Sequence, residues 1–161
     1  MTSGGTADAL DLAVVGNCEV AALIDRQARV VWMCLPRPDG DPVFSALLTR
    51  TGGDAARGVF AIDLVGVVDS QQRYLRNTAI VESELCDDRC NRIRITDFCP
   101  RFRARGRMFR PMMLVRIVER VSGRPLLRVR LRPTAHYGAH AADGRRGVHH
   151  LRFSAAGVDY R

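Results

Sequence analysis

The chain has 161 residues, of which 47% are hydrophobic and 26% charged, a balance that is ordinary for a soluble globular domain able to bury a core without disulfides or metals. It shows neither a secretory signal nor an apolar run near the roughly 20 residues that span a bilayer, so a cytoplasmic protein without a membrane partner is expected. The net charge of +8 comes from 25 arginines and no lysine, which indicates an arginine-biased composition more than a phosphate-backbone ligand.

The first part of the chain alternates short apolar runs with turn residues, a pattern that predicts β-strands. Strands are expected at 12–15, 20–24 and 30–35. The polar segment 25–29 separates the last two and predicts a hairpin turn.

One short helix is predicted at 42–49, after a loop that is rich in proline. Asp41 can cap this helix, and Pro42 suits its first position. Phe44 and Leu47 fall on one helical face, so the sequence predicts a strand, a stiff loop and one or two turns of helix.

Further strands follow. Apolar side chains at Phe60, Ile62 and Leu64 alternate with Ala61 and Asp63, which predicts a half-buried strand. Two hairpins are then predicted, one with strands at 79–86 and 92–98 and the other with strands at 114–121 and 126–132. Many short strands with little helix favour an all-β fold, an antiparallel β-sandwich.

Basic residues concentrate in one span, because residues 89–132 hold 14 arginines and 2 acidic residues. Arg128, Arg130 and Arg132 alternate with apolar residues, which predicts a row of guanidinium groups on a solvated outer face of a sheet. A face that docks onto an acidic protein is the alternative. Nucleic-acid binding is the least favoured hypothesis, and its stacking groups would be Phe98, Phe102 and Phe109.

No metal or other cofactor is expected. The five cysteines form no disulfide framework and lie mostly in apolar runs, where a buried free thiol is the simplest interpretation. The spacings of His136 with His140 and of His149 with His150 are not those of a zinc site.

A series of segments in a fixed order is similar to the N-terminal domain of glycoside hydrolase family 15, which contains bacterial glucoamylases and trehalase-like enzymes. These segments are Gly16-Asn17, 21–25, 31–37 with Trp32 and Cys34, 42–48, 72–78, 95–100, Arg110-Pro111, 114–123 and 129–133. The resemblance covers about residues 10–138.

A disordered tail is expected over 1–10, and the resemblance implies an incomplete N-terminal sandwich of the super-sandwich type over 11–161. Further strands and a catalytic (α/α)6 barrel would lie outside this chain. In that family the barrel carries the two glutamates that act as general acid and general base in inverting hydrolysis. No catalytic residue is therefore assigned here, and the chain alone is expected to be inactive. The implied partners are its own barrel and, through it, an α-glucoside such as trehalose or a malto-oligosaccharide.

The same resemblance implies that loop 36–44 faces the sugar site of the barrel, with Trp32, Arg37 and Asp39 as the candidate substrate-binding residues. An indole can pack on a sugar face, and a guanidinium and a carboxylate can bind hydroxyls. The structural alternatives are core packing for Trp32, which is favoured, and a local ion pair between Arg37 and Asp39.

Two departures from the family pattern bear on structure. Pro38 and Gly40 replace an aromatic residue and a serine in the loop. Ala28 stands where the family usually has glycine, which costs about 1 kcal/mol if the position needs a positive φ. A free-standing sandwich that binds a carbohydrate or a protein without catalysis remains the alternative function.

Overall fold

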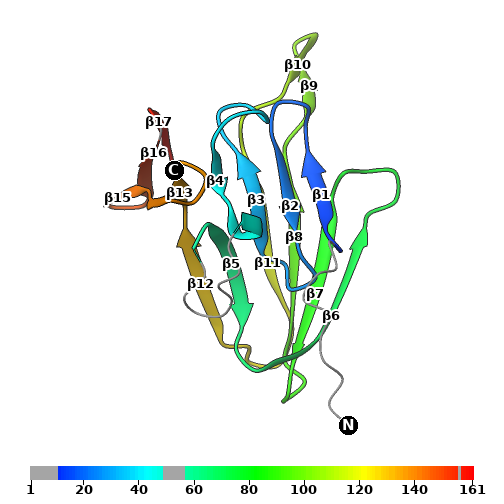
Figure 1. Ribbon diagram of the computed structural model, residues 1–161. Coiled ribbons are helices and arrows are strands. Elements are labelled where there is room, and N and C mark those ends of the chain that lie inside the picture. The colour runs from blue at the N-terminus through cyan, green and yellow to red at the C-terminus, as the bar shows by residue number, and fades with distance from the viewer. Residues whose placement is uncertain (1–10, 49–56, 156) are drawn as a thin grey trace.

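The computed structural model describes residues 11–48, 57–155 and 157–161, and the expected tail over 1–10 lies outside them. Two antiparallel β-sheets pack face to face, so the predicted β-sandwich is confirmed (Figure 1). The first sheet consists of β1 (Ala13–Gly16), β2 (Ala21–Ile24), β3 (Val30–Cys34), β5 (Val59–Leu64) and β12 (Leu127–Arg132), with β4 (Pro42–Phe44) paired to β3. The second sheet has the order β11 (Val115–Ser122), β8 (Arg92–Phe98), β7 (Val81–Asp87) and β6 (Val67–Tyr74).

Two clusters of buried side chains fill the space between the sheets. One joins first-sheet residues such as Val15 and Ile24 to Val81 of β7. The other joins Ile62 of β5 to Leu85 of β7 and to two isoleucines of β8. Because successive side chains of a strand point to opposite faces, each sheet contributes one apolar face to this core.

Two of the three predicted hairpins are confirmed. Strand β2 pairs with β3 across the turn after Ile24, and β7 pairs with β8 across the turn after Asp87. In the second turn the Asp87 carboxylate accepts hydrogen bonds from the backbone N–H groups of Arg89 and Asn91 at 2.9 and 2.8 Å. These turns form locally, since the side chains that stabilise them are near neighbours in the sequence.

The prediction of a hairpin from 114–121 and 126–132 is wrong. Strand β11 pairs with β8 in the second sheet, whereas β12 pairs with β5 in the first. The turn between them therefore carries the chain from one sheet to the other. The side chain of Asn91 accepts the backbone N–H of Arg124 at 2.8 Å, and the N–H of Val65 donates to the carbonyl of Leu126 at 2.9 Å, so contacts with both sheets hold this crossing.

The predicted helix at 42–49 is also largely wrong. Pro42–Phe44 forms β4, and only Ala46–Leu48 forms a single 3-10 turn, η1, while Thr49 lies outside the described residues. All three residues of β4 are buried, and the N–H groups of Ser45 and Ala46 both donate to the carbonyl of Gly58. Burial of the three residues of β4, together with their pairing to β3, outweighed the local preference for a helix.

Strand β5 is more buried than the predicted half-buried pattern. Ala61 and Val59, which face away from the main core, are 0% and 2% exposed and pack with Ala46 of η1. The connection after β4 thus covers the outer face of this strand.

The arginine row of β12 is on one face, as predicted, but it is not wholly solvated. Arg130 is 9% exposed and forms a two-pronged ion pair with Asp63 at 2.6 and 3.0 Å. On the opposite face Val129 is 64% exposed. The reason lies in the offset of the sheets, because β12 lies at an edge of the first sheet, on the side away from β7 and β6 (Figure 1).

Arg116 of β11 connects the two sheets. Its guanidinium donates to both carboxylate oxygens of Asp97 at 2.7 and 3.1 Å. It also donates to the carbonyl of Phe60 at 2.9 Å and to that of Ala28, and it lies 4.7 Å from the Phe60 ring centre. Burial raises the pKa of Asp97, and Arg116 opposes that effect. Ala28 has a φ of 56°, so its position does need the left-handed conformation that glycine adopts at lower cost.

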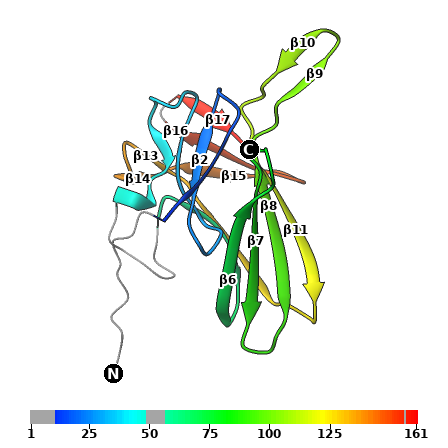
Figure 2. The ribbon, with the colours of Figure 1, turned by 90° about the vertical axis from the view of Figure 1, so that its right-hand side faces the viewer.

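The described residues also form three smaller groups of strands: β9 (Phe102–Ala104) with β10 (Arg107–Phe109), β13 (Thr134–Ala135) with β14 (His140–Ala141), and β15 (Asp143–Arg146) with β16 (Leu151–Ala155) and β17 (Val158–Tyr160). The β9–β10 hairpin extends away from the sandwich (Figure 2). Within the described residues, no helix has the length and apolar character needed to cross a bilayer.

Candidate functional site

The loop after β3 contains two of the three candidate residues, and they bind each other. The guanidinium of Arg37 donates to Asp39 from Nε at 2.9 Å and from Nη2 at 3.1 Å. The Arg37 side chain is 75% exposed and that of Asp39 is 70% exposed. The hydrogen bond and the charge of Arg37 lower the pKa of Asp39. The local ion pair offered as the structural alternative is therefore present, and both side chains remain accessible.

The loop is closed at its base by backbone hydrogen bonds. The N–H of Gly40 donates to the carbonyl of Arg37 at 3.0 Å, and that of Leu35 donates to the carbonyl of Asp41 at 3.4 Å. The loop is therefore a compact turn that is stabilised by hydrogen bonds between its own backbone groups.

Asp41 fastens the end of this loop to a distant segment. Its carboxylate accepts the backbone N–H groups of His136 at 2.5 Å and of Tyr137 at 2.7 Å. Those two residues have positive φ angles of 53° and 55°, and Gly138 follows with 90°. Non-glycine residues adopt this conformation at a cost, so the two charge-assisted hydrogen bonds compensate for it. Sequence reasoning missed this role because it placed Asp41 at a helix cap.

Trp32 does not lie in the core, so the favoured prediction for it is wrong. It is directly opposite Leu23 in the ladder, between residues of β2 whose side chains enter the core. Trp32 thus lies on the outer face of the first sheet and is partly exposed. Burial raises the pKa of the nearby Cys34 thiol, the Trp32 side chain opposes that effect, and the charges of Asp41 and Asp39 add to it.

The structure therefore brings most of the candidate group to one region. Trp32 belongs to β3, which leads into the loop that carries Arg37 and Asp39, and Asp41 joins the end of that loop to His136 and Tyr137. An indole, an ion pair and a segment with exposed His136 and Tyr137 are available at this end of the sandwich. Nothing in the sequence near 136–137 indicated this association, since it joins residues about a hundred positions apart.

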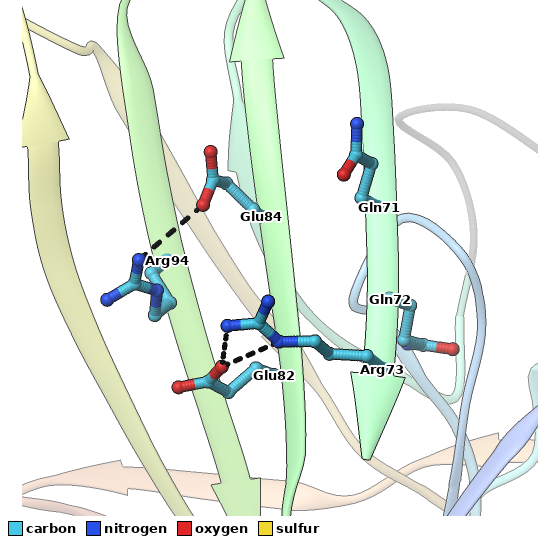
Figure 3. Close-up of a pocket in the computed structure, with 6 residues that line it drawn as sticks. All are labelled: Gln71, Gln72, Arg73, Glu82, Glu84 and Arg94. Carbon is cyan, nitrogen blue, oxygen red and sulfur yellow. Dashed lines mark hydrogen bonds and ion pairs between the residues drawn. The ribbon is translucent and has the colours of Figure 1, made fainter. Parts of the chain in front are cut away.

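A shallow hollow lies elsewhere, on the outer face of the second sheet (Figure 3). It has a volume of about 110 Å³, and its lining residues are Gln71, Gln72, Arg73, Glu82, Glu84 and Arg94. Arg73 donates to Glu82 at 2.7 and 3.1 Å, and Arg94 lies 3.6 Å from Glu84. Each carboxylate is thus matched by a guanidinium. The hollow can offer donors and acceptors to a neutral polar ligand, but a free catalytic carboxylate pair is not present among these residues.

The described residues offer little for a metal ion. They contain no group of three or more histidine, cysteine, aspartate or glutamate side chains placed to hold one. The rings of His136 and His140 meet edge to face at 5.6 Å, and all five cysteines are free thiols.

The residues that carried the resemblance now have structural roles. Asp97 and Arg116, from two of the ordered segments, form the buried pair between the sheets, and the segment with Trp32 leads into the fastened loop. The fold and the site together define a β-sandwich domain with a constrained loop at one end.

Comparison with known proteins identifies the family. Residues 2–156 match the family described as trehalase-like, N-terminal, so the chain belongs to that family. It is 34% identical over 73 residues to a trehalase of Mycolicibacterium smegmatis and 36% identical over 73 residues to a trehalase of Mycobacterium tuberculosis. Each match covers 45% of this chain and 10% of the relative, so the chain spans only a small part of those proteins. No solved structure matches it.

Proposed function

We propose that this chain is the non-catalytic N-terminal domain of a cytoplasmic, trehalase- or glucoamylase-like inverting α-glucoside hydrolase of glycoside hydrolase family 15. In this proposal the domain packs on a helical barrel outside the chain and shapes the rim of its sugar site. The substrate is an α-glucoside, trehalose or a malto-oligosaccharide. The observation that carries the proposal is the family match over residues 2–156.

The loop after β3 is the part of the domain that we assign to the rim. It presents the Arg37–Asp39 pair to solvent, with hydrogen-bond donors and acceptors of the kind that bind sugar hydroxyls. Trp32, on the outer sheet face near the loop, offers an aromatic surface. Asp41 supports the proposal because it fixes the loop in one conformation.

The first test is an activity assay of the 161-residue chain. Trehalose, maltose and starch oligosaccharides should yield no glucose, because both catalytic glutamates belong to the barrel. Glucose release that a point substitution within this chain abolishes would refute the proposal.

The second test uses the longer polypeptide with its barrel. Arg37→Ala and Asp39→Ala should each lower kcat/KM by about tenfold to a hundredfold, since a lost hydrogen bond to a charged group costs about 1.5–3 kcal/mol. The control is Glu119→Ala, which removes an exposed charged side chain from the second sheet. It should leave kcat/KM unaltered. Unchanged kcat/KM in both loop variants would show that Arg37 and Asp39 do not contribute to the rim of the sugar site.

A second candidate function is a carbohydrate-binding sandwich without catalysis. The observation that favours it is the hollow on the second sheet, whose two arginines and two glutamates give a lining of zero net charge that suits a neutral polyol. Titration of the chain with maltoheptaose, followed by NMR, would show shifts at Gln71 and Arg94. Shifts confined to the β3 loop would instead support the rim.

A further inference from the structure

The β9–β10 hairpin and the residues beside it, here called the arm (residues 101–113), have an unusual composition. The arm contains five arginines, three methionines, two phenylalanines, and one alanine, glycine and proline each. Guanidinium is therefore its only polar side-chain group. No carboxylate occurs between Asp97 and Glu119, so nothing nearby in the sequence neutralises this charge.

The apolar side chains of the arm are exposed to solvent. The exposed fractions lie between 42% and 58% for Phe102, Met108, Phe109, Met112 and Met113. Single exposed apolar residues are common, but a group of them in one short segment indicates contact with another apolar phase.

The arm projects from the sandwich with a defined shape (Figure 2). Phe102 and Phe109 are directly opposite each other and stack at 5.5 Å. Arg105 and Gly106 form the tip with φ angles of 50° and 72°, as a two-residue hairpin turn requires. The shape is thus set by the hairpin itself, although an isolated two-stranded hairpin is only marginally stable.

A buried asparagine holds the base of the arm. Asn17 is 1% exposed, and its side-chain amide donates to the carbonyl of Pro100 at 2.9 Å and to that of Pro111 at 2.8 Å. Its carbonyl oxygen accepts the N–H groups of Glu19 and Val20. One side chain therefore ties both ends of the hairpin to the β1–β2 turn, and the arm is a positioned element of the fold.

We propose that the arm binds the surface of an anionic phospholipid membrane. Its arginines contact lipid phosphates, which the guanidinium fork fits well. Its phenylalanine and methionine side chains enter the interface beneath them. A flat surface can reach a protruding arm without touching the rest of the sandwich. A domain without an apolar run long enough to span a bilayer can still bind at the membrane surface.

Two other partners fit the arm less well. A single-stranded nucleic acid needs free aromatic faces, whereas Phe102 and Phe109 each use one face on the other. A protein partner would have to supply an acidic group for each of five closely spaced guanidinium groups, whereas an anionic membrane presents phosphates over its whole surface.

The test is sedimentation of the chain with vesicles at low ionic strength. Vesicles of equimolar phosphatidylglycerol and phosphatidylcholine should bind it, and pure phosphatidylcholine vesicles should not. Arg103→Ser with Arg105→Ser should weaken binding roughly 25-fold, at about fivefold for each arginine. The matched control is Arg89→Ser with Arg124→Ser, which changes the net charge equally in turns away from the arm, and it should weaken binding less than about threefold.

A second variant separates the apolar contribution. Phe102→Ala should weaken vesicle binding by roughly tenfold, and circular dichroism should show that the sandwich remains folded. The proposal fails if neither vesicle type binds, if both bind equally, or if the two arginine variants behave alike. It also fails if a single-stranded oligothymidylate binds more tightly than the anionic vesicles at the same salt concentration.

Discussion

Two arginine–aspartate pairs in this chain have nearly the same geometry and different surroundings. The nitrogen–oxygen distances are 2.7 and 3.1 Å for Arg116 with Asp97, and 2.9 and 3.1 Å for Arg37 with Asp39. The side chains of the first pair are 3% and 0% exposed, and those of the second are 75% and 70% exposed. Geometry alone therefore does not say which pair the fold needs.

The difference follows from the dielectric environment. Water competes for the exposed pair and screens its charges, so such pairs usually contribute about 0–1 kcal/mol. In the interior both charged groups are shielded from water, so loss of one partner leaves the charge of the other buried and unpaired. The interior pair is therefore expected to matter for the stability of the sandwich, whereas both side chains of the loop pair remain accessible to another partner.

The largest predicted effect is that of Arg116→Ala. It should lower the free energy of unfolding by about 3–5 kcal/mol, because it leaves the Asp97 carboxylate buried without a partner. Urea denaturation measures this directly. Removing the charge as well, in Arg116→Ala with Asp97→Asn, should restore part of the loss. A loss below about 1 kcal/mol in the single variant would contradict the contrast between the pairs.

An intermediate effect is predicted for Asp41→Ala. The carboxylate satisfies two backbone N–H groups in a segment with positive φ, so its loss should cost about 1.5–3 kcal/mol. Asp41→Asn keeps one acceptor oxygen and should lose about half as much. Equal losses in the two variants would mean that the hydrogen bonds to His136 and Tyr137 do not act separately.

The smallest effect is predicted for the exposed pair. Arg37→Ala and Asp39→Ala should each change the free energy of unfolding by less than about 0.5 kcal/mol. A larger thermal destabilisation would show that the loop pair is structural.

The pH dependence of the exposed pair follows from the lowered pKa of Asp39. A carboxyl group whose pKa is lower in the folded state contributes stability above its unfolded pKa, and that stability is lost as the pH falls through the folded value. Thermal melting of the parent chain and of Arg37→Ala should therefore converge below about pH 4. Curves that separate further in acid would contradict this sign.

The family and the strand content were accessible from the sequence, and the candidate site only in part. Ordered segments indicated the family, and the positions of Arg37 and Asp39 in a proline-rich loop indicated an exposed site. The fastening of that loop was not predictable, because Asp41 binds backbone groups of His136 and Tyr137. Backbone donors have no sequence signature of their own.

The sequence by itself determined most strands of the two large sheets and the two local hairpins β2–β3 and β7–β8. Alternation of apolar and polar residues sets which face of a strand is buried, and turn residues act over four or five positions. Tertiary structure decided the rest. It sent β11 and β12 into different sheets and made a strand of Pro42–Phe44. It also turned Trp32 outward and Arg116 inward. In each case the local pattern allowed two arrangements, and the free energy of burying apolar surface and pairing backbone groups across the whole sandwich selected one.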